Sequence, residues 1–305
     1  MSVPVADSVR RAAPDARIVW AVESRCSPVV DRLRLVSAVH EFPRDRWKRT
    51  RWSPTTWRDQ MIAYTRLRRE RFELGVDLQG HSKTALCLRL AKPARRLASR
   101  ATDALARRLN PLASGDPESM HAVDWNLHVL SMLGEFPREA HWTMPDLACE
   151  RLALRGRVPK GLLATIATAT GTPAKSYPPE GWAEVAKGLT AMGMRVAFLG
   201  GPGDPRPQAA GTTDLVDKLK LSETMAAVAM SAIHLAGDTG TGHMAAAYGV
   251  PVVSVFGPTR PEQYRPYTSN GIALREGPDP ASVKPKAILE AAATLLGSHE
   301  TALPH

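Results

Sequence analysis

The segment with the clearest chemical character is Asp-Thr-Gly-Thr-Gly-His-Met-Ala-Ala-Ala, which runs from Asp238 to Ala247. It follows the apolar run 232–236, so the pattern predicts a strand, a tight loop and a helix that begins with small residues. Free backbone N–H groups and the positive end of a helix suit a diphosphate at such a loop. His243 could donate to a phosphate oxygen or a leaving group, and Asp238 could accept from ribose or sugar hydroxyls.

Both side chains also have structural interpretations. Asp238 could cap the helix, and His243 could be an ordinary polar residue in its first turn. The stretch Gly240-Thr-Gly-His-Met-Ala245 also fits the G-x-G-x-x-A form of a dinucleotide fingerprint, which would indicate an oxidoreductase. The match lies late in the chain, however, and the next strand ends at Phe256-Gly-Pro258 without an acidic residue to hold a ribose. The segment therefore favours a phosphate-bearing ligand other than a dinucleotide cofactor.

Three other polar loops follow predicted strands. Thr-Ala-Thr-Gly-Thr-Pro-Ala precedes Lys175, which could meet the same phosphates or be a solvated charge. Gly-Gly-Pro-Gly precedes Asp204, which could touch a nucleoside or begin a turn. The loop Asp77-Leu-Gln-Gly-His-Ser-Lys83 could present an acceptor, or be a helix entry capped by Ser82.

Several familiar motifs are missing from the sequence. It contains no D-x-D pair to hold a metal on a nucleotide diphosphate, and no H-E-x-x-H, G-x-x-x-x-G-K-[ST] or G-x-S-x-G. The charge of a diphosphate leaving group would then be met by backbone amides, Lys175 and His243. The pattern predicts a metal-independent transfer that needs no cofactor beyond the substrate nucleotide sugar.

The elements that position these loops alternate between strand and helix. In the first half the apolar patterns predict strands at 17–22, 74–79 and 95–99 and helices at 55–71, 82–90 and 118–133. In the second half they predict strands at 162–167, 194–199, 232–236 and 251–256 and helices at 179–192, 222–230, 241–248 and 285–296. The pattern lapses around 135–160, where we place a linker. The sequence therefore predicts an α/β fold of two successive domains, residues 1–150 and 151–305.

Composition narrows the class of protein further. The chain has 305 residues, 44% of them hydrophobic and 23% charged, as in globular proteins with two domains. Its net charge of +10 favours nucleic acid, an anionic membrane surface or phosphorylated substrates, or is simply a solvated arginine-rich surface. Cys26, Cys87 and Cys149 are spaced as free, buried thiols, which predicts a reducing cytoplasm. Neither a membrane span nor a signal peptide is indicated, so any membrane contact would be peripheral.

At family level the sequence resembles glycosyltransferase family 9, the ADP-heptose:lipopolysaccharide heptosyltransferases. Asp238–Ala247 followed by Val-Pro-Val-Val-Ser-Val-Phe-Gly-Pro-Thr at 250–259 is close to the family's D-[ST]-G-x-x-H-x-A-A-A and V-P-V-V-x-x-F-G-P-T. Supporting matches occur in the family's order at 14–20, 76–80, 121–124, 175–178 and 199–203. The resemblance covers nearly the whole chain.

The resemblance implies a GT-B arrangement of two Rossmann-like domains with an interdomain cleft, in which the first domain binds the acceptor and the second the nucleotide sugar. It implies donor binding by Lys175, Asp204, Asp238, Thr239, Gly240 and His243. The implied reaction transfers a heptose from ADP-heptose to the lipopolysaccharide inner core. The implied partners are this nucleotide sugar, the lipopolysaccharide precursor and the inner membrane as a peripheral contact, and not nucleic acid.

One departure concerns the catalytic base. Family members open with a strand and an L-G-D loop before the helix that corresponds to Val3–Arg10, and the aspartate of that loop is the group expected to be the base. Met1 falls at the start of this helix, and Asp7 lies within it, so no catalytic residue is assigned here. We expect either that the true start lies upstream, which we favour, or that the chain is a paralogue that binds a nucleotide sugar or lipopolysaccharide precursor without efficient transfer. A missing first strand would leave a gap or a raw edge in the first sheet.

Overall fold

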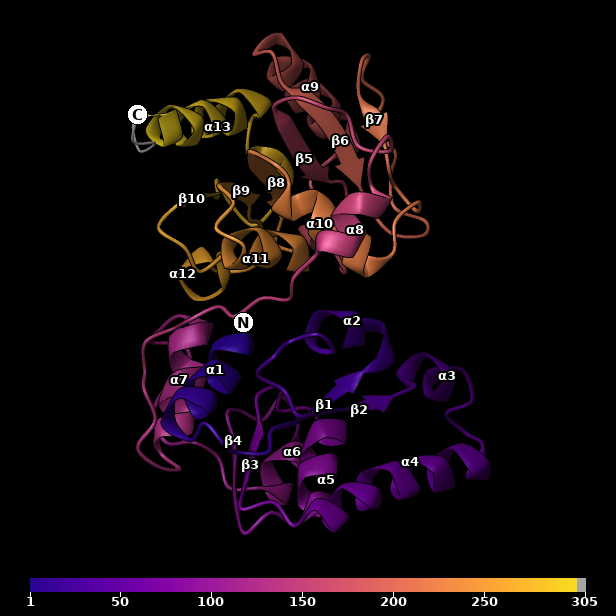
Figure 1. Cartoon of the computed structure of the whole chain (residues 1–305), viewed down its shortest axis with the longest axis vertical. Helices are drawn as coiled ribbons and strands as arrows, with labels where there is room; N and C mark the ends of the chain where they lie inside the picture. Colours follow the sequence, from indigo (N-terminus) through magenta and orange to yellow (C-terminus); the bar gives the residue numbers. More distant parts are fainter. Residues whose placement is uncertain (301–305) are drawn as a thin grey trace. The chain divides into compact units, whose positions relative to one another are not determined.

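The computed structural model describes residues 1–300, with side-chain surroundings for residues 1–297. The chain divides into two compact units, Met1–Pro145 (unit 1) and Asp146–His305 (unit 2). Figure 1 labels their helices and strands. Each unit alternates parallel strands with helices, which is the pattern that the sequence predicts.

Unit 2 is built on one six-stranded parallel sheet in the order β10-β9-β8-β5-β6-β7. Its strands are β5 (Leu163–Ala167), β6 (Arg195–Leu199), β7 (Thr213–Asp214), β8 (Ile233–Gly237), β9 (Val252–Val255) and β10 (Gly271–Leu274). Its helices are α8 (Ala148–Ala153), α9 (Pro179–Ala191), α10 (Leu221–Ala229), α11 (Gly240–Ala247), α12 (Pro261–Tyr264) and α13 (Pro285–Glu300). All residues of β5, β8 and β9 are buried, as in a parallel sheet that helices cover on both faces.

Unit 1 has two separate two-stranded parallel sheets, β1-β2 and β3-β4. The strands are β1 (Val19–Glu23), β2 (Ala38–Phe42), β3 (Leu74–Asp77) and β4 (Arg95–Ala98). The helices are α1 (Val3–Ala12), α2 (Ser27–Val30), α3 (Arg44–Arg49), α4 (Pro54–Arg66), α5 (Ser82–Ala91), α6 (Ala104–Leu109) and α7 (Ala122–Ser131). Strand β2 and helix α3 were not predicted, because half-buried residues and a run of charges obscure their periodicity.

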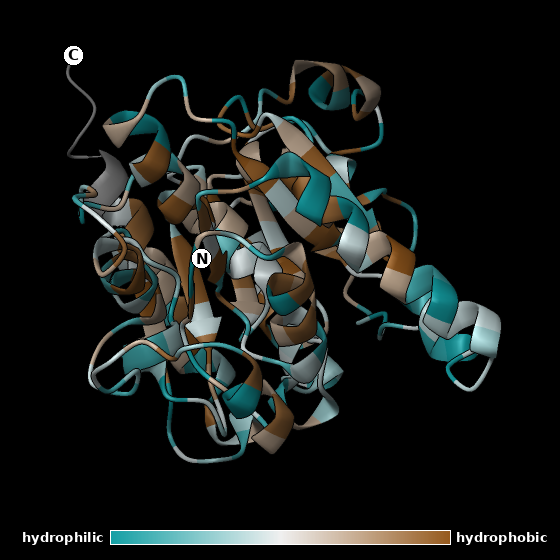
Figure 2. Ribbon diagram, turned by 90° about the horizontal axis from the view of Figure 1, so that it is seen from below, coloured by the Kyte–Doolittle hydropathy of each residue, from teal (hydrophilic) through white to brown (hydrophobic). Residues whose placement is uncertain are grey.

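The hydrophobic cores differ between the units. In unit 2, strands β5, β6, β8 and β9 share one core with α9 and α13, centred on Trp182 and Phe198. The ring of Tyr177 meets Trp182 edge-on at 4.7 Å, and its hydroxyl donates to the Val283 carbonyl at 2.8 Å. Unit 1 has several smaller clusters around α1, α5 and α7. Figure 2 shows brown, hydrophobic segments along strands and teal, hydrophilic segments along many loops, as expected where apolar side chains pack against the sheets.

The three cysteines are free, but only Cys87 is buried. The prediction of buried thiols is therefore wrong for Cys26 and Cys149, which lie in a short 3₁₀ turn and in the first turn of α8 and are exposed. Burial raises the pKa of Cys87 to about 12. Within residues 1–300, no helix combines the length and the apolar character that crossing a membrane requires.

Candidate functional site

Three loops of unit 2 follow the carboxyl ends of neighbouring strands. Residues 168–175 follow β5, residues 200–204 follow β6, and residues 238–239 follow β8. The order of strands reverses between β5 and β8, because the chain continues from β5 to β6 and β7 on one side and then returns to β8 on the other. Open α/β sheets bind ligands outside such a switch point. The loops after β5 and β8 are therefore the first place to look for a site.

Lys175 and Asp238 come from these two loops and form an ion pair. Lys175 Nζ donates to Asp238 Oδ2 at 2.7 Å, and the side chains are 33% and 11% exposed. Gly237 permits this approach, since a Cβ there would lie 2.8 Å from Thr170 Cγ2 and 3.2 Å from the Lys175 carbonyl oxygen. An ammonium group has three N–H donors, so Lys175 can bind an anion while it remains bonded to Asp238.

The amino terminus of α11 lies directly after Asp238. The N-cap residue is Thr239 rather than Asp238, and within the described residues its side chain makes no capping hydrogen bond. The first backbone N–H groups of a helix have no partner inside the helix, and together with the helix dipole they attract anions. Gly240 is exposed at this end and His243 is half-buried in the first turn. Lys175, Asp238, Thr239, Gly240 and His243 thus belong to one end of the sheet.

A buried histidine that the sequence did not reveal supports the same helix end. His234 lies on β8, and its Nε2 meets Thr241 Oγ1 at 3.0 Å while its Nδ1 meets Thr165 Oγ1 at 2.9 Å. The Thr165 hydroxyl donates to Ser231 Oγ, so the Thr165 oxygen accepts the hydrogen bond from His234 Nδ1–H. The other ring nitrogen, His234 Nε2, then carries no proton and accepts from the Thr241 hydroxyl. Complete burial lowers the pKa of His234 to about 3. A neutral imidazole therefore ties the first turn of α11 to the sheet.

Asp204 lies in the neighbouring loop, after β6, and is not part of the Lys175–Asp238 ion pair. Its Oδ2 accepts from the Gly201 N–H at 2.7 Å, so it closes its own turn. A Cβ on Gly200 would lie 2.9 Å from Thr168 Oγ1 and 3.1 Å from Asp204 Oδ2, which shows that the loops after β5 and β6 touch. Among residues 1–297, no group of three or more His, Cys, Asp or Glu side chains is placed to hold a metal ion.

In unit 1, the loop that begins at Asp77 is internally bonded. Asp77 accepts from the N–H groups of Gln79 and Gly80 at 2.9 and 3.0 Å, and from Thr84 Oγ1 at 2.9 Å. The N-cap of α5 is His81, so the interpretation of Ser82 as the cap is wrong. Ser82 is instead the first helical residue, and its backbone N–H donates to the carboxylate of Asp103, which follows β4.

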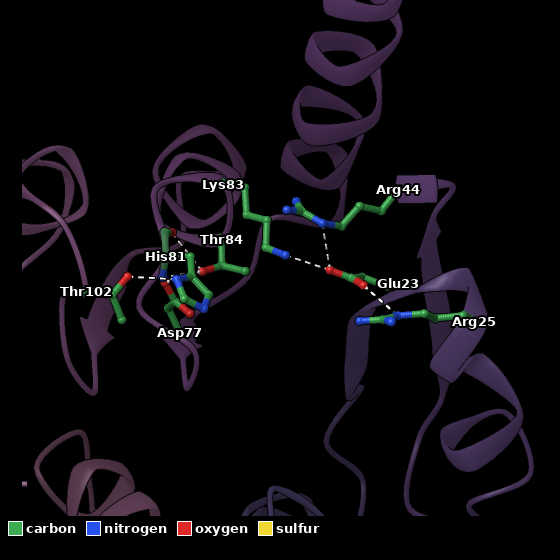
Figure 3. A network of polar contacts seen from close by, with 8 residues as sticks. All are labelled: Glu23, Arg25, Arg44, Asp77, His81, Lys83, Thr84 and Thr102. Atoms are coloured by element: carbon green, nitrogen blue, oxygen red, sulfur yellow. Dashed lines mark hydrogen bonds and ion pairs between the residues drawn. The ribbon is translucent and has the colours of Figure 1, made fainter. Parts of the chain in front are cut away.

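A second polar cluster lies at the carboxyl ends of β1 and β2, and Figure 3 shows its cations pointing toward Glu23. Lys83 Nζ, Arg25 Nε and Arg44 Nε lie 2.6, 3.0 and 3.1 Å from the Glu23 carboxylate. Burial alone would raise the pKa of Glu23, but the Lys83 hydrogen bond and the surrounding cations hold it below its usual range. A cavity of about 180 Å³ beside this carboxylate is lined by residues 23–25 and 43–46. Glu23 belongs to no distinguishing motif, and its place at the end of an apolar run is the one signal in the sequence that could have found it.

Comparisons with known proteins identify the family and the fold. The family model of glycosyltransferase family 9 (heptosyltransferase) matches residues 63–291. The chain is 26% identical over 271 residues to lipopolysaccharide heptosyltransferase 1 of Pseudomonas aeruginosa, covering 85% of this chain and 75% of that protein. The structure of E. coli ADP-heptose lps heptosyltransferase II superposes with a TM-score of 0.79 at 19% identity, over 98% of this chain and 95% of that one. The E. coli heptosyltransferase WaaC with ADP-2-deoxy-2-fluoro heptose gives a TM-score of 0.76 at 21% identity, over 96% and 94%.

The predicted α/β fold class, matching that of GT-B heptosyltransferase structures, is confirmed. The family model and the curated relatives define the class of protein as a glycosyltransferase that uses a nucleotide sugar. The chain belongs to glycosyltransferase family 9. This membership favours the enzyme over the oxidoreductase and over the paralogue without efficient transfer.

Proposed function

We propose that the chain transfers a heptose from ADP-heptose to the inner core of lipopolysaccharide, without a metal ion or other cofactor. The observation that supports this donor is the Lys175–Asp238 pair at the β5–β8 switch point, beside the amino end of α11. Related proteins are named lipopolysaccharide heptosyltransferases, and one related structure contains a fluorinated ADP-heptose.

The donor diphosphate would bind at the amino end of α11, contacted by Lys175 and by the backbone at Thr239 and Gly240. As the bond from the anomeric carbon to the diphosphate breaks, negative charge grows on the departing ADP. A fixed ammonium group and helix N–H groups stabilise such charge without reorganising. His243 would donate to the diphosphate, and Asp238 would accept from sugar hydroxyls.

Asp204 would contact the nucleoside from the loop after β6. Its carboxylate already orders that loop through the Gly201 N–H at 2.7 Å. Ribose hydroxyls could reach the remaining acceptor positions of a carboxylate, which has about four lone-pair sites. This contact would orient the nucleoside and leave the diphosphate to Lys175.

The acceptor would bind to unit 1, at the cavity beside Glu23. Arg25, Arg44 and Lys83 surround this carboxylate, and Arg46 also lines the cavity. One guanidinium group can donate two parallel hydrogen bonds to the oxygens of a phosphate or carboxylate. A saccharide that bears such anionic groups could therefore bind to this cluster of cations. The chain would act in the cytoplasm, in peripheral contact with the inner membrane, and its partners would not include nucleic acid.

Thermal unfolding with and without ADP-heptose tests the donor site. Saturating ADP-heptose should raise Tm, since a ligand at a hundred times its Kd stabilises by about 2.7 kcal/mol. Lys175→Ala should weaken binding about 10- to 100-fold, because a hydrogen bond to a charged group contributes about 1.5–3 kcal/mol. His243→Ala should weaken it less.

The matched control is Lys187→Ala, which removes an exposed lysine from α9 in the same unit. Its response to ADP-heptose should equal that of the unaltered chain. If no nucleotide sugar raises Tm, the proposed donor site is wrong. If only a different nucleotide sugar does so, the site stands and the assigned sugar is wrong.

A further inference from the structure

The surface of α4 and of the loop before it combines exposed tryptophans with arginines. Trp52, Trp57, Met61 and Ile62 are 77%, 58%, 44% and 57% exposed. They are four of the eleven large hydrophobic side chains exposed among residues 1–297, and they fall within eleven residues of sequence. Single exposed hydrophobic residues are ordinary, but a contiguous group marks an interaction surface.

The group is contiguous because Arg51 joins its two tryptophans. The Arg51 guanidinium lies 5.2 Å from the centre of the Trp52 ring, in a cation–π contact. The Trp57 indole N–H donates to the Arg51 carbonyl at 2.7 Å. Both indoles are thereby held beside one arginine at the start of α4.

Helical spacing extends this patch along α4. Met61 follows Trp57 by one turn, and Ile62 follows Arg58 by one turn, so the four side chains form two adjacent rows. Tyr64, three residues after Met61, is buried on the adjoining side of α4, where it packs on Phe42 and Trp47 and fixes the helix to unit 1. The exposed side chains thus extend from a helix that is packed on α5 (Figure 1).

Positive charge surrounds these apolar side chains. Residues 44–71 contain ten Arg or Lys and three Asp or Glu, which gives +7 of the chain's net +10. Arg49, Arg51, Arg58 and Arg66 are all exposed. Two of the three acidic groups, Asp59 and Glu70, are already paired with Arg46 and Arg17. The surface around α4 is therefore strongly cationic.

We propose that Arg49, Arg51, Trp52, Trp57, Arg58, Met61 and Ile62, here called the Trp–Arg patch, bind the surface of a bilayer that contains anionic phospholipid. Indole rings suit the boundary between headgroups and acyl chains, and arginine stems lie along apolar surface while their heads reach phosphates. A basic amphipathic helix with several cations binds anionic lipid at about 1 kcal/mol per Lys or Arg. This proposal deepens the proposed function by naming the surface that contacts the membrane. It rests on the proposed function in one respect only, namely that the acceptor is linked to a lipid.

Co-sedimentation of the chain with vesicles tests this proposal. The chain should bind vesicles of phosphatidylcholine mixed with phosphatidylglycerol and leave vesicles of phosphatidylcholine alone in suspension. Raising the salt concentration should release it, since exposed charges are screened. Trp52→Ser with Trp57→Ser, and separately Arg49→Glu with Arg51→Glu and Arg58→Glu, should each lower partitioning about tenfold or more.

Matched controls come from exposed residues of unit 2. Leu152→Ser with Leu162→Ser removes two exposed apolar side chains, and Lys160→Glu with Lys187→Glu and Lys284→Glu reverses three exposed charges. Both controls should bind mixed vesicles as the unaltered chain does. Unchanged Tm shows that each variant folds, and quenching of tryptophan fluorescence by brominated phospholipid should disappear in the tryptophan variant.

Equal binding to both vesicle types, or undiminished binding by the patch variants, would overturn the proposal. Self-association that depends on Trp52 and Trp57, without lipid binding, would assign the patch to contact between copies of the chain. The Tm shift with ADP-heptose is measured without lipid and should be the same in all patch variants. If the chain fails to bind vesicles, the proposed donor site is therefore unaffected. If ADP-heptose fails to raise Tm, the proposed membrane surface is likewise unaffected.

Discussion

In unit 2, β5 lies between β6 and β8 and pairs with both, whereas in unit 1 β1 pairs only with β2 and β3 only with β4. Each unit nevertheless has an ion pair that links two separate elements near the carboxyl end of a strand. In unit 2 it is Lys175–Asp238, and in unit 1 it is Lys83–Glu23. Main-chain pairing also joins the two strands next to the pair in unit 2, whereas in unit 1 the side-chain pair links β1 to helix α5.

This difference separates two ways of positioning polar groups. The buried ladder of unit 2 fixes the loops after β5 and β8 next to each other, so a lysine and an aspartate meet without further support. In unit 1 the ends of β1 and β3 belong to different sheets, and Glu23 holds Lys83, Arg25 and Arg44 together. We infer that the donor site is rigid and that the cluster around Glu23 can adjust to its ligand.

Hydrogen exchange provides the largest expected contrast. Amides of β5 and β8 should exchange only on global unfolding of unit 2, because those strands are fully buried and paired. Amides of β1 and β3 should exchange about 10³-fold faster, since each strand has one neighbour and opening free energies reach down to about 0 kcal/mol. Mass-spectrometric exchange of peptides 18–24, 73–78 and 162–168 measures this. Equal protection of the amides in all three peptides would contradict the comparison. It would show that the edges of β1 and β3 that have no strand neighbour are covered in solution.

The pH dependence of unit 2 gives a second, smaller effect. His234 has a pKa of about 3 when folded against an ordinary value near 6.5, so it contributes stability above about pH 6.5 that is lost as the pH falls toward 3. At pH 5 the loss should be about 2 kcal/mol, from 1.36 kcal/mol per pKa unit. Urea denaturation at pH 7.5 and pH 5 measures it.

His234→Asn should remove most of this acid sensitivity and lower stability at pH 7.5, because an asparagine side chain cannot span from Thr165 to Thr241. The matched control is His141→Asn, which replaces an exposed histidine of unit 1. An unaltered acid response in the His234→Asn variant would mean that another group causes it.

The sequence predicted the unit 2 elements well because physical periodicity was strong there. Apolar runs such as 163–167 and 233–237 are buried on both faces, and prolines mark the first turns of α9 and α13. Strand β2 escaped because its residues are half-buried and mixed in polarity. Two strands of unit 2, β7 and β10, were missed for the related reason that they are short and only partly buried.

The candidate site was predictable where it followed a strand and unpredictable where it depended on tertiary contacts. Lys175 and Asp238 stand in loops after apolar runs, but their pairing required the strand order, which places β5 beside β8. His234 lies inside an apolar strand, and only the partners Thr165 and Thr241 give it a role. Glu23 had no motif, because its significance comes from cations up to 60 residues away.

The smallest expected effect concerns the Lys83–Glu23 pair, which links helix α5 to the end of β1. The side chains are 24% and 17% exposed, so water screens the pair only in part. Lys83→Met should cost about 1 kcal/mol, because Arg25 and Arg44 still neutralise Glu23. A double-mutant cycle with Glu23→Gln isolates the coupling, with Lys92→Met as the exposed control in the same unit.

The cations keep the pKa of Glu23 below its usual range, so the contribution of Glu23 to stability is present above about pH 4.5 and is lost as the pH falls through the lowered pKa. Lys83→Met should therefore also reduce the loss of stability on the acid side. Zero coupling in the cycle would show that this ion pair does not stabilise unit 1.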